Sequence, residues 1–255
     1  MVIEQPSFHI VPAGRGLHWF SAGFALFWRQ PWLWLGITMV FLLILLTLGQ
    51  ASWLAMAAPL LMLPMFGGLQ IGCAQMQGGE ALEFDHLLAG FQAPLRGLLG
   101  LAAAYIVMQL FTDQIGKLLA RLMGLQALFD AMNQAGTGNL EPLMNTLPSL
   151  AGVFMLWLSV VAVLAFLVSL AFLFAPALVA VGRVLPQAAL LASFRAASAN
   201  WRALSVYGLV FALFALVAMC TVLGAFLLLP LSITTAYIAY RDVFADLPEQ
   251  LSENP

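Results

Sequence analysis

The stretch Leu87-Leu88-Ala89-Gly90-Phe91-Gln92-Ala93-Pro94-Leu95-Arg96 is the one around which the chain is organised. It recurs as Leu190-Leu191-Ala192-Ser193-Phe194-Arg195 and, more loosely, as Phe20-Ser21-Ala22-Gly23-Phe24 with Arg29 following. In each copy the large apolar residues share one helical face, and each copy leads into a long apolar run. We call these copies the leading segments. They predict a threefold repeat of an interfacial helix followed by a membrane hairpin. The alternative is that Phe and Arg simply stand before membrane helices, without a repeat.

The composition restricts the class of protein. The 255 residues are 63% hydrophobic and 8% charged, which excludes an ordinary soluble domain. The length accommodates about six membrane helices of roughly 20 residues each. A net charge of −2 gives no basic field, so no nucleic-acid partner is expected. The first 30 residues are mixed and polar, and they do not resemble a cleavable signal peptide.

The hydropathy pattern predicts an all-α integral membrane protein. Six transmembrane helices are expected as three related hairpins, each preceded by a cytoplasmic amphipathic segment. Residues 1–18 are expected to form a flexible N-terminal arm, 19–244 a single six-helix transmembrane domain, and 245–255 a disordered tail. The predicted spans are residues 32–48, 53–76, 95–111, 149–175, 203–222 and 225–243. An outer amphipathic segment at 113–134 either lies on the membrane surface or continues the third span.

The positive charges give the orientation, because loops rich in Lys and Arg stay in the cytoplasm. With six spans, one side of the membrane carries only Lys117 and Arg121. The other side carries Arg15, Arg29, Arg96, Arg183, Arg195, Arg202 and Arg241. Both termini are therefore expected in the cytoplasm. On this topology Cys73 and Cys220 lie near opposite membrane faces, so we expect no disulfide between them.

Four prolines, Pro59, Pro64, Pro176 and Pro230, all fall in the second helix of a predicted hairpin. We expect helix kinks at these positions. The kinks are either packing features or parts of broken helices that surround a binding site near the membrane midplane. An ion-coupled transporter usually carries carboxylates at membrane depth, and the predicted spans lack them.

The sequence offers no catalytic, cofactor or metal site. The three histidines lie outside the predicted spans, and no motif of a metalloprotease, serine hydrolase or phosphate-binding loop is present. Glu80, Glu83, Asp85 and His86 are close in sequence, but their spacing fits no metal-binding loop, and a solvated acidic loop is the preferred interpretation. We therefore do not expect an enzyme.

Four arginines stand at the predicted membrane edge beside aromatic residues, namely Arg29, Arg96, Arg195 and Arg202. One interpretation is that they only keep the loops in the cytoplasm while their stems lie along the membrane. The other is that they bind anionic lipid head groups, for which the arginine fork is suited.

Two terminal motifs carry a family resemblance. Near the C-terminus stands Ala236-Tyr237-Ile238-Ala239-Tyr240-Arg241-Asp242-Val243-Phe244, and near the N-terminus stand Gly14-Arg15-Gly16-Leu17-His18-Trp19 and Phe27-Trp28-Arg29-Gln30-Pro31. Together with Gly90-Phe91 and Phe194-Arg195, they resemble a group of uncharacterised bacterial polytopic inner-membrane proteins, the YciC-like set. The chain is also similar to the membrane domain of some glycerophosphodiester phosphodiesterases.

The resemblance implies a six-helix protein of the bacterial inner membrane, and it implies no activity. The phosphodiesterase similarity does not carry catalysis, since these residues include no soluble catalytic domain. The first functional hypothesis is a non-enzymatic scaffold or membrane-organisation factor with a membrane-protein partner. The alternative is a lipid-interacting or small-solute transport protein, with anionic lipid as a candidate ligand.

Overall fold

The computed structural model describes residues 6–50, 52–92 and 94–245. Within these ranges the chain is all-helical and has no strand, which confirms the predicted all-α class. The helices of the described residues are α1 (Arg15–Trp28), α2 (Pro31–Leu48), α3 (Ser52–Gln77), α4 (His86–Ala89), α5 (Leu95–Leu122), α6 (Gln126–Gly136), α7 (Glu141–Phe172), α8 (Ala175–Ala180), α9 (Pro186–Ala199), α10 (Trp201–Ala218) and α11 (Val222–Val243).

Five helical stretches in the described residues are long and apolar enough to cross a membrane. They are residues 31–48, 57–77, 95–122, 141–180 and 201–218. By length and composition, these stretches agree with the prediction of several apolar helices that can span a membrane. Helix α11 is outside this group, and its second half carries Thr234, Thr235, Tyr237, Arg241 and Asp242.

The predicted outer segment divides into two parts. Helix α5 runs without interruption to Leu122, so the first part continues the third predicted span. An ion pair of 2.6 Å between Lys117 Nζ and Asp113 Oδ2 lies on this extension, at the i, i+4 spacing that favours a helix. The chain then turns at Gly124, which has a φ of +71°, and the second part forms α6. Helix α7 begins at Glu141, earlier than the predicted span, and contains Pro148.

The described part of the N-terminal arm is bonded to the opposite end of the chain. The His9 amide donates to the Val243 carbonyl oxygen at 2.8 Å. The Asn200 side chain accepts from the Val11 amide at 2.8 Å and donates to the His9 carbonyl oxygen at 2.9 Å. Residues 15–18 belong to α1. These bonds join residues 189 to 234 positions apart, so the sequence around residue 9 contains no local signal of them. Residues 1–5 and 246–255, which hold the rest of the predicted arm and nearly all of the predicted tail, are outside the described residues.

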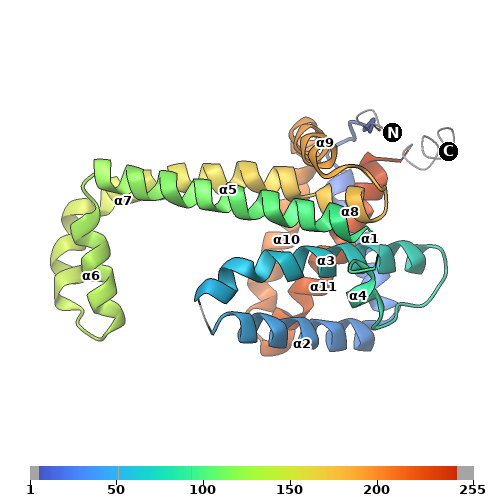
Figure 1. The fold of residues 1–255 in the computed structure, drawn as a ribbon, viewed down its shortest axis with the longest axis horizontal. Coiled ribbons are helices and arrows are strands. Elements are labelled where there is room, and N and C mark those ends of the chain that lie inside the picture. The colour runs from blue at the N-terminus through green and yellow to red at the C-terminus, as the bar shows by residue number, and fades with distance from the viewer. Residues whose placement is uncertain (1–5, 51, 93, 246–255) are drawn as a thin grey trace. The chain divides into compact units, whose positions relative to one another are not determined.

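The chain divides into two compact units, residues 1–105 with 170–255 (unit 1) and residues 106–169 (unit 2). Unit 1 has a large apolar core, in which Trp19, Trp34 and Tyr237 are fully buried. Helix α11 contacts α1, α2, α3, α8 and α10, so it is the central helix of this unit. Figure 1 shows α2 and α3 side by side within it.

Each leading segment contacts another helix through the small residue that precedes its Phe. A Cβ atom on Gly23 of α1 would overlap Thr235 of α11. A Cβ atom on Gly90, which follows α4, would overlap the Pro64 carbonyl of α3. In the third segment the buried Ser193 hydroxyl lies at the break between α7 and α8. It donates to the Leu170 carbonyl oxygen at 2.9 Å and accepts from the Phe174 amide at 3.0 Å.

Unit 2 has a small core formed by Ala120, Leu125 and Leu128. Phe129, Phe154 and Trp157 pack around it as a group of three rings, with Phe129 edge-on to Trp157 at a centroid distance of 5.2 Å. The indole nitrogen of Trp157 donates to the Gly116 carbonyl oxygen at 2.8 Å, which joins α7 to α5. Many other apolar side chains of this unit are exposed, Val163 and Phe166 among them.

Candidate functional site

A pocket of about 910 Å³ opens in unit 1, where α3 ends, α5 begins and α8 leads into α9. Its volume is within the range of about 300–1,000 Å³ that is usual for small-molecule sites. The walls are mainly apolar, with Ile71 from α3 and Val179 and Val181 from the region of α8. Four polar residues also line it, namely Gln75, Glu80, Gln92 and Arg183. The pocket therefore offers an amphipathic surface at the ends of three apolar helical stretches.

The α3 side of the pocket is fixed by local hydrogen bonds. The Arg29 guanidinium donates to the Met76 carbonyl oxygen at 2.7 Å, in the last turn of α3. The Met76 carbonyl oxygen also accepts from the Gly79 amide at 3.2 Å, so the guanidinium adds a second hydrogen bond at the end of the helix. Helix α3 ends just before Gly79, whose φ of +96° takes the chain away from the helix. Glu80 follows at once and reaches the pocket.

Gln75 is oriented by His86. The Glu83 amide donates to His86 Nδ1 at 2.8 Å, so the ring proton is on Nε2. Nε2 then donates to the side-chain oxygen of Gln75. The amide nitrogen of Gln75 keeps its two protons for other acceptors. A hydrogen-bond donor thus remains at the pocket wall.

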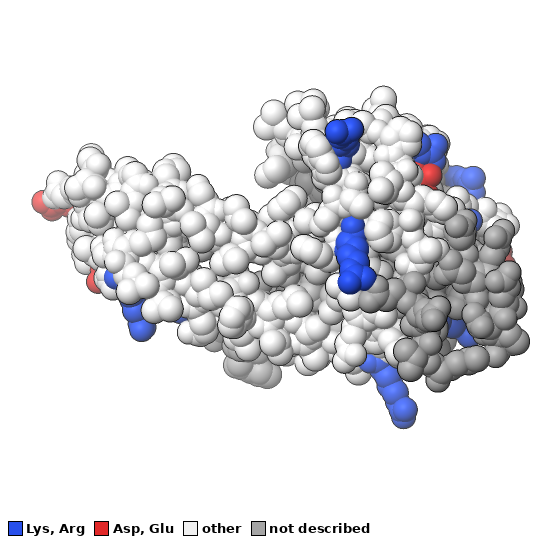
Figure 2. Space-filling view, turned by 90° about the horizontal axis from the view of Figure 1, so that it is seen from above, with Lys and Arg blue, Asp and Glu red and all other residues white. Residues whose placement is uncertain are grey.

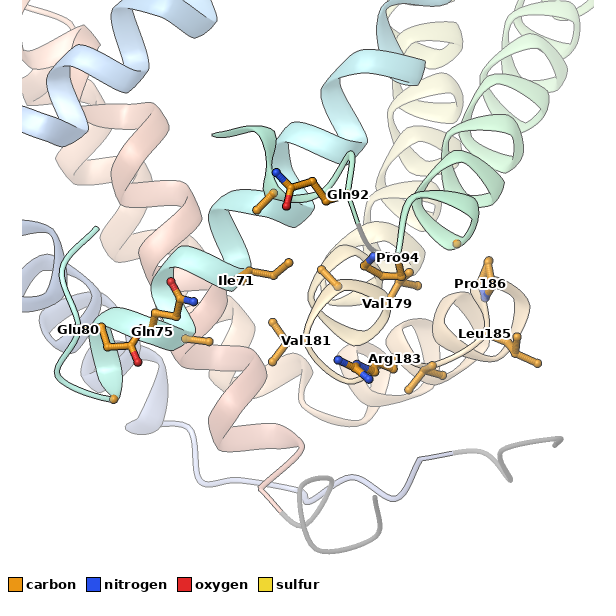
Figure 3. Close-up of a pocket in the computed structure, with 16 residues that line it drawn as sticks. Ile71, Gln75, Glu80, Gln92, Pro94, Val179, Val181, Arg183, Leu185 and Pro186 are labelled. Atoms are coloured by element: carbon orange, nitrogen blue, oxygen red, sulfur yellow. The ribbon is translucent and has the colours of Figure 1, made fainter. Parts of the chain in front are cut away.

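Arg183 lies opposite, in the turn between α8 and α9. Its φ of +50° is in the left-handed region, and it is the only non-glycine residue with positive φ among the described residues. A bond of 3.0 Å from the Val184 amide to the Leu178 carbonyl oxygen closes this turn. Residues held in this region store strain and often mark functional sites. Figure 3 shows the Arg183 guanidinium pointing into the pocket, with Gln75 and Glu80 on the other side.

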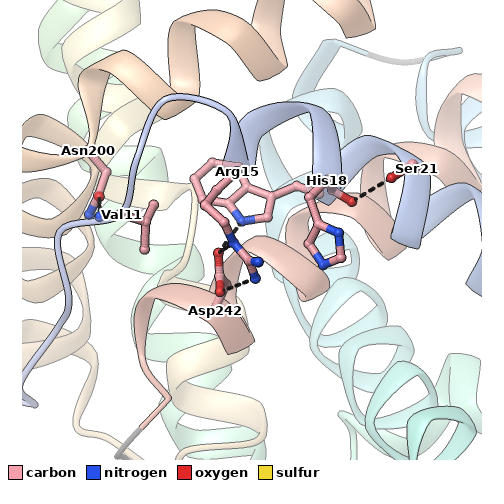
Figure 4. Close-up of polar contacts among 7 residues, drawn as sticks. Val11, Arg15, His18, Ser21, Asn200 and Asp242 are labelled. Carbon is pink, nitrogen blue, oxygen red and sulfur yellow. Dashed lines mark hydrogen bonds and ion pairs between the residues drawn. The ribbon is translucent and has the colours of Figure 1, made fainter.

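A second polar cluster joins the two ends of the chain (Figure 4). Arg15 donates to both carboxylate oxygens of Asp242, at 2.8 Å from Nε and 2.5 Å from Nη2. The Trp19 indole nitrogen donates to the same carboxylate at 2.7 Å. The hydrogen bonds to Asp242 and its negative charge raise the pKa of the Arg15 guanidinium above its usual value. The cluster holds α1 against the end of α11, and it is separate from the residues that line the pocket.

No protein-family model, curated protein or solved structure matches the chain. Its function is therefore argued from the pocket and its surroundings.

None of the four arginines considered as possible lipid contacts lines the pocket. Arg29 contacts the end of α3, and Arg202 lies over the Trp201 ring with its guanidinium carbon 5.5 Å from the ring centroid. Arg96 is exposed in the first turn of α5, and Arg195 is exposed on α9. Figure 2 shows the Lys and Arg side chains of one face as separate groups on a mostly uncharged surface.

The four predicted kink sites fall into two classes. Pro59 and Pro64 lie inside α3, and Pro230 lies inside α11; both helices continue through these positions. Pro176 is the second residue of α8, directly after the break that follows α7. Pro94 and Pro186, which were not among the candidates, line the pocket.

The sequence interpretation missed both Arg183 as a pocket residue and Asp242 as a partner of Arg15. Arg183 was counted only as a topological charge, and no local pattern reveals a positive φ at an arginine. Arg15 and Asp242 lie in the two terminal motifs, but neither motif by itself indicates that the two residues pair. The acidic loop residues form no metal site among the described residues, and Cys73 and Cys220 are free thiols.

Proposed function

We propose that the protein is a bacterial inner-membrane protein with six spans in three related hairpins and both termini in the cytoplasm. The sixth span would be α11, whose 22 residues extend about 33 Å, enough for a hydrocarbon core of about 30 Å. A central helix faces protein on most sides and needs less apolar surface than one that faces lipid. The contacts of α11 with α1, α2, α3, α8 and α10 support this position.

The threefold repeat is supported by the order of the contacts that the leading segments make. The second segment meets α3 of the first hairpin at Gly90, and the third meets the end of α7 at Ser193. The first segment meets α11 of the last hairpin at Gly23. The second and third segments thus each contact the second helix of the preceding hairpin. The first segment contacts the second helix of the last hairpin, which completes a cycle of three.

Within this topology we propose that the protein is a non-enzymatic lipid-binding protein, with the pocket as its head-group site. The observation that carries the proposal is an amphipathic pocket at the ends of the apolar stretches 57–77, 95–122 and 141–180. On the topology above, these ends are cytoplasmic, which is the level of lipid head groups. An arginine fork can bind a phosphate with two hydrogen bonds, and Arg183 provides such a fork.

The test is phospholipid retention by the purified full-length protein. Arg183→Gly removes the guanidinium at a backbone position that glycine adopts without strain, so the fold is preserved. We expect the variant to lose most of the phospholipid that the wild type retains in native mass spectrometry. Arg202→Gln is the matched control, because Arg202 is a surface arginine outside the pocket. Equal lipid retention by all three proteins would refute the proposed site.

A scaffold for a partner protein is the second candidate function. It is favoured by exposed apolar residues of unit 2, some of which stand beside charged residues. Leu118 and Leu122 are 56% and 75% exposed beside Lys117 and Arg121, and Met144 is 72% exposed. A photo-crosslinking residue at position 122 is expected to capture one discrete protein in membranes. The same group at position 166, on an apolar stretch that would face lipid, is the control. Identical crosslinks from both positions would exclude a partner site at Leu122.

A further inference from the structure

We propose that the pocket takes a zwitterionic phospholipid head group, with the phosphate against Arg183 and a primary ammonium group against Glu80. This inference rests on the proposed lipid-binding function and names the class of lipid. It differs from the anionic lipids that were one of two interpretations of Arg29, Arg96, Arg195 and Arg202 in the sequence. Three observations support it. The pocket is lined by one charge of each sign, its two ionic side chains have no partner among the described residues, and the described residues of its walls are not aromatic.

The charges that line the pocket are one of each sign. Arg183 is the only basic residue and Glu80 the only acidic residue among the described residues that line it. They belong to different connections, Glu80 to the loop after α3 and Arg183 to the turn after α8. An anionic head group would meet the repulsion of the Glu80 carboxylate, whereas a zwitterionic group has a charge for each side chain.

Both ionic side chains lack a partner within the described residues. No hydrogen bond or ion pair of the described chain involves the guanidinium of Arg183 or the carboxylate of Glu80. The two do not pair with each other, and Figure 3 shows them on different sides of the pocket. A ligand that carries both charges can therefore occupy the space between them. The amide nitrogen of Gln75, whose oxygen is bonded to His86, adds a donor near the α3 side.

The walls distinguish a primary from a quaternary ammonium group. Quaternary ammonium ligands such as choline are recognised by aromatic cages. The described residues that line the pocket include no aromatic side chain. A primary ammonium group instead donates hydrogen bonds to a carboxylate, and Glu80 supplies one. The apolar residues Ile71, Val179 and Val181 suit the glycerol backbone and the first methylenes of the acyl chains.

The test is a competition among three lipids for the full-length protein in detergent, read by native mass spectrometry. The probes are phosphatidylethanolamine, phosphatidylglycerol and phosphatidylcholine with the same acyl chains, added in equal amounts. We expect the wild type to retain phosphatidylethanolamine about tenfold over the other two, as one charge-assisted hydrogen bond provides. Arg183→Gly should reduce retention of all three lipids. Glu80→Gln should lower the retention of phosphatidylethanolamine to that of phosphatidylcholine and leave the retention of phosphatidylcholine nearly unchanged.

The outcomes separate this inference from the function on which it rests. Retention that depends on Arg183 but favours phosphatidylglycerol, with no effect of Glu80→Gln, would overturn the zwitterionic assignment and keep the lipid-binding function. Retention independent of Arg183 would overturn both. Displacement of the bound lipid by water-soluble glycerophosphoethanolamine at equal concentration would show that the acyl chains contribute nothing. In that case a free solute would replace the lipid as the ligand. Arg202→Gln should match the wild type in every arm.

Discussion

Units 1 and 2 bury their apolar residues in different ways. In unit 1 the side chains of Trp19, Trp34 and Tyr237 are fully enclosed by protein. The buried core of unit 2 consists of Ala120, Leu125 and Leu128, while Val163 and Phe166 remain more than half exposed. Both units also expose apolar side chains, Trp32 and Val217 of unit 1 among them, so the difference is in the size of the buried core. In a bilayer, lipid covers the exposed side chains of a span as well as protein does.

This difference bears on where the protein can form a rigid binding pocket. A pocket needs walls that keep their position, and close packing provides such walls. Unit 1 has helices in direct backbone contact, as at Gly23 and Gly90, and its pocket lies among them. Unit 2 is joined by side-chain contacts around Trp157. When the same kind of substitution is made once in each unit, we therefore expect a larger loss of stability in unit 1 than in unit 2.

The largest contrast is expected between two glycines. Gly90→Ala should lower the free energy of unfolding by about 3 kcal/mol, because the new methyl group overlaps the Pro64 carbonyl. Gly152→Ala in α7 should leave stability unchanged or raise it by up to about 1 kcal/mol, since no atom lies within 4 Å of the added carbon. Denaturant unfolding in detergent micelles measures both. Equal effects would remove the distinction between the two units.

A smaller contrast is expected between two aspartates. Asp242→Asn should cost about 2 kcal/mol, because the bonds from Arg15 and Trp19 lose their charged acceptor. Asp113→Asn should cost less than about 0.5 kcal/mol, because Asp113 and Lys117 form an exposed pair on one helix. The same unfolding assay applies. A large loss at Asp113 would mean that unit 2 depends on its polar contacts more than its geometry indicates.

Two serines, one in each unit, provide a third contrast between units 1 and 2. Ser193→Ala should cost about 1.5 kcal/mol, because the Leu170 carbonyl and the Phe174 amide lose the hydroxyl that links them. Ser159→Ala should change stability by less than about 0.5 kcal/mol, since its exposed hydroxyl bonds only within its own helix. Thermal unfolding, followed by size-exclusion chromatography, compares the variants. No difference between them would show that the break between α7 and α8 needs no support from α9.

The smallest effect is expected inside unit 2. Trp157→Phe should cost about 1 kcal/mol, because the Gly116 carbonyl loses its donor while most of the ring contacts remain. Hydrogen exchange should then increase in residues 106–169 and stay unchanged around the pocket. Trp201→Phe is the control, since Trp201 is 60% exposed. Faster exchange at the pocket residues would show that the two units do not unfold independently.

Most helices of the fold can be predicted from the sequence. Apolar runs of suitable length predicted the helices, and the boundary of α2 differs from its predicted span by one residue at Pro31. The boundaries that differed most, the end of α5 and the start of α7, lie where amphipathic sequence follows or precedes an apolar run. Hydropathy changes there although the backbone stays helical, because helix formation does not require an apolar environment.

The candidate site was harder to predict from the sequence than the helices were. The sequence selected four arginines by their distance from the apolar runs, and the structure gives Arg29 a role at the end of α3 instead. Arg183 is a candidate site residue because its turn adopts a left-handed backbone conformation and because α3, more than 100 residues earlier in the chain, forms another wall of the same pocket. Which connections meet is a matter of tertiary packing, and the pattern of a single segment contains no information on it.

By itself, the sequence determined the class of this protein: a chain with 63% hydrophobic residues and 8% charged residues must place its helices in an apolar environment. It also identified the small residue before Phe in each leading segment as a feature of the chain. Only the tertiary structure decided what those residues touch, that Arg15 meets Asp242, and that Glu80 and Arg183 line the same pocket. The physical reason is that hydropathy and helix propensity act over one or two turns, whereas these contacts join residues that only the folded chain brings together.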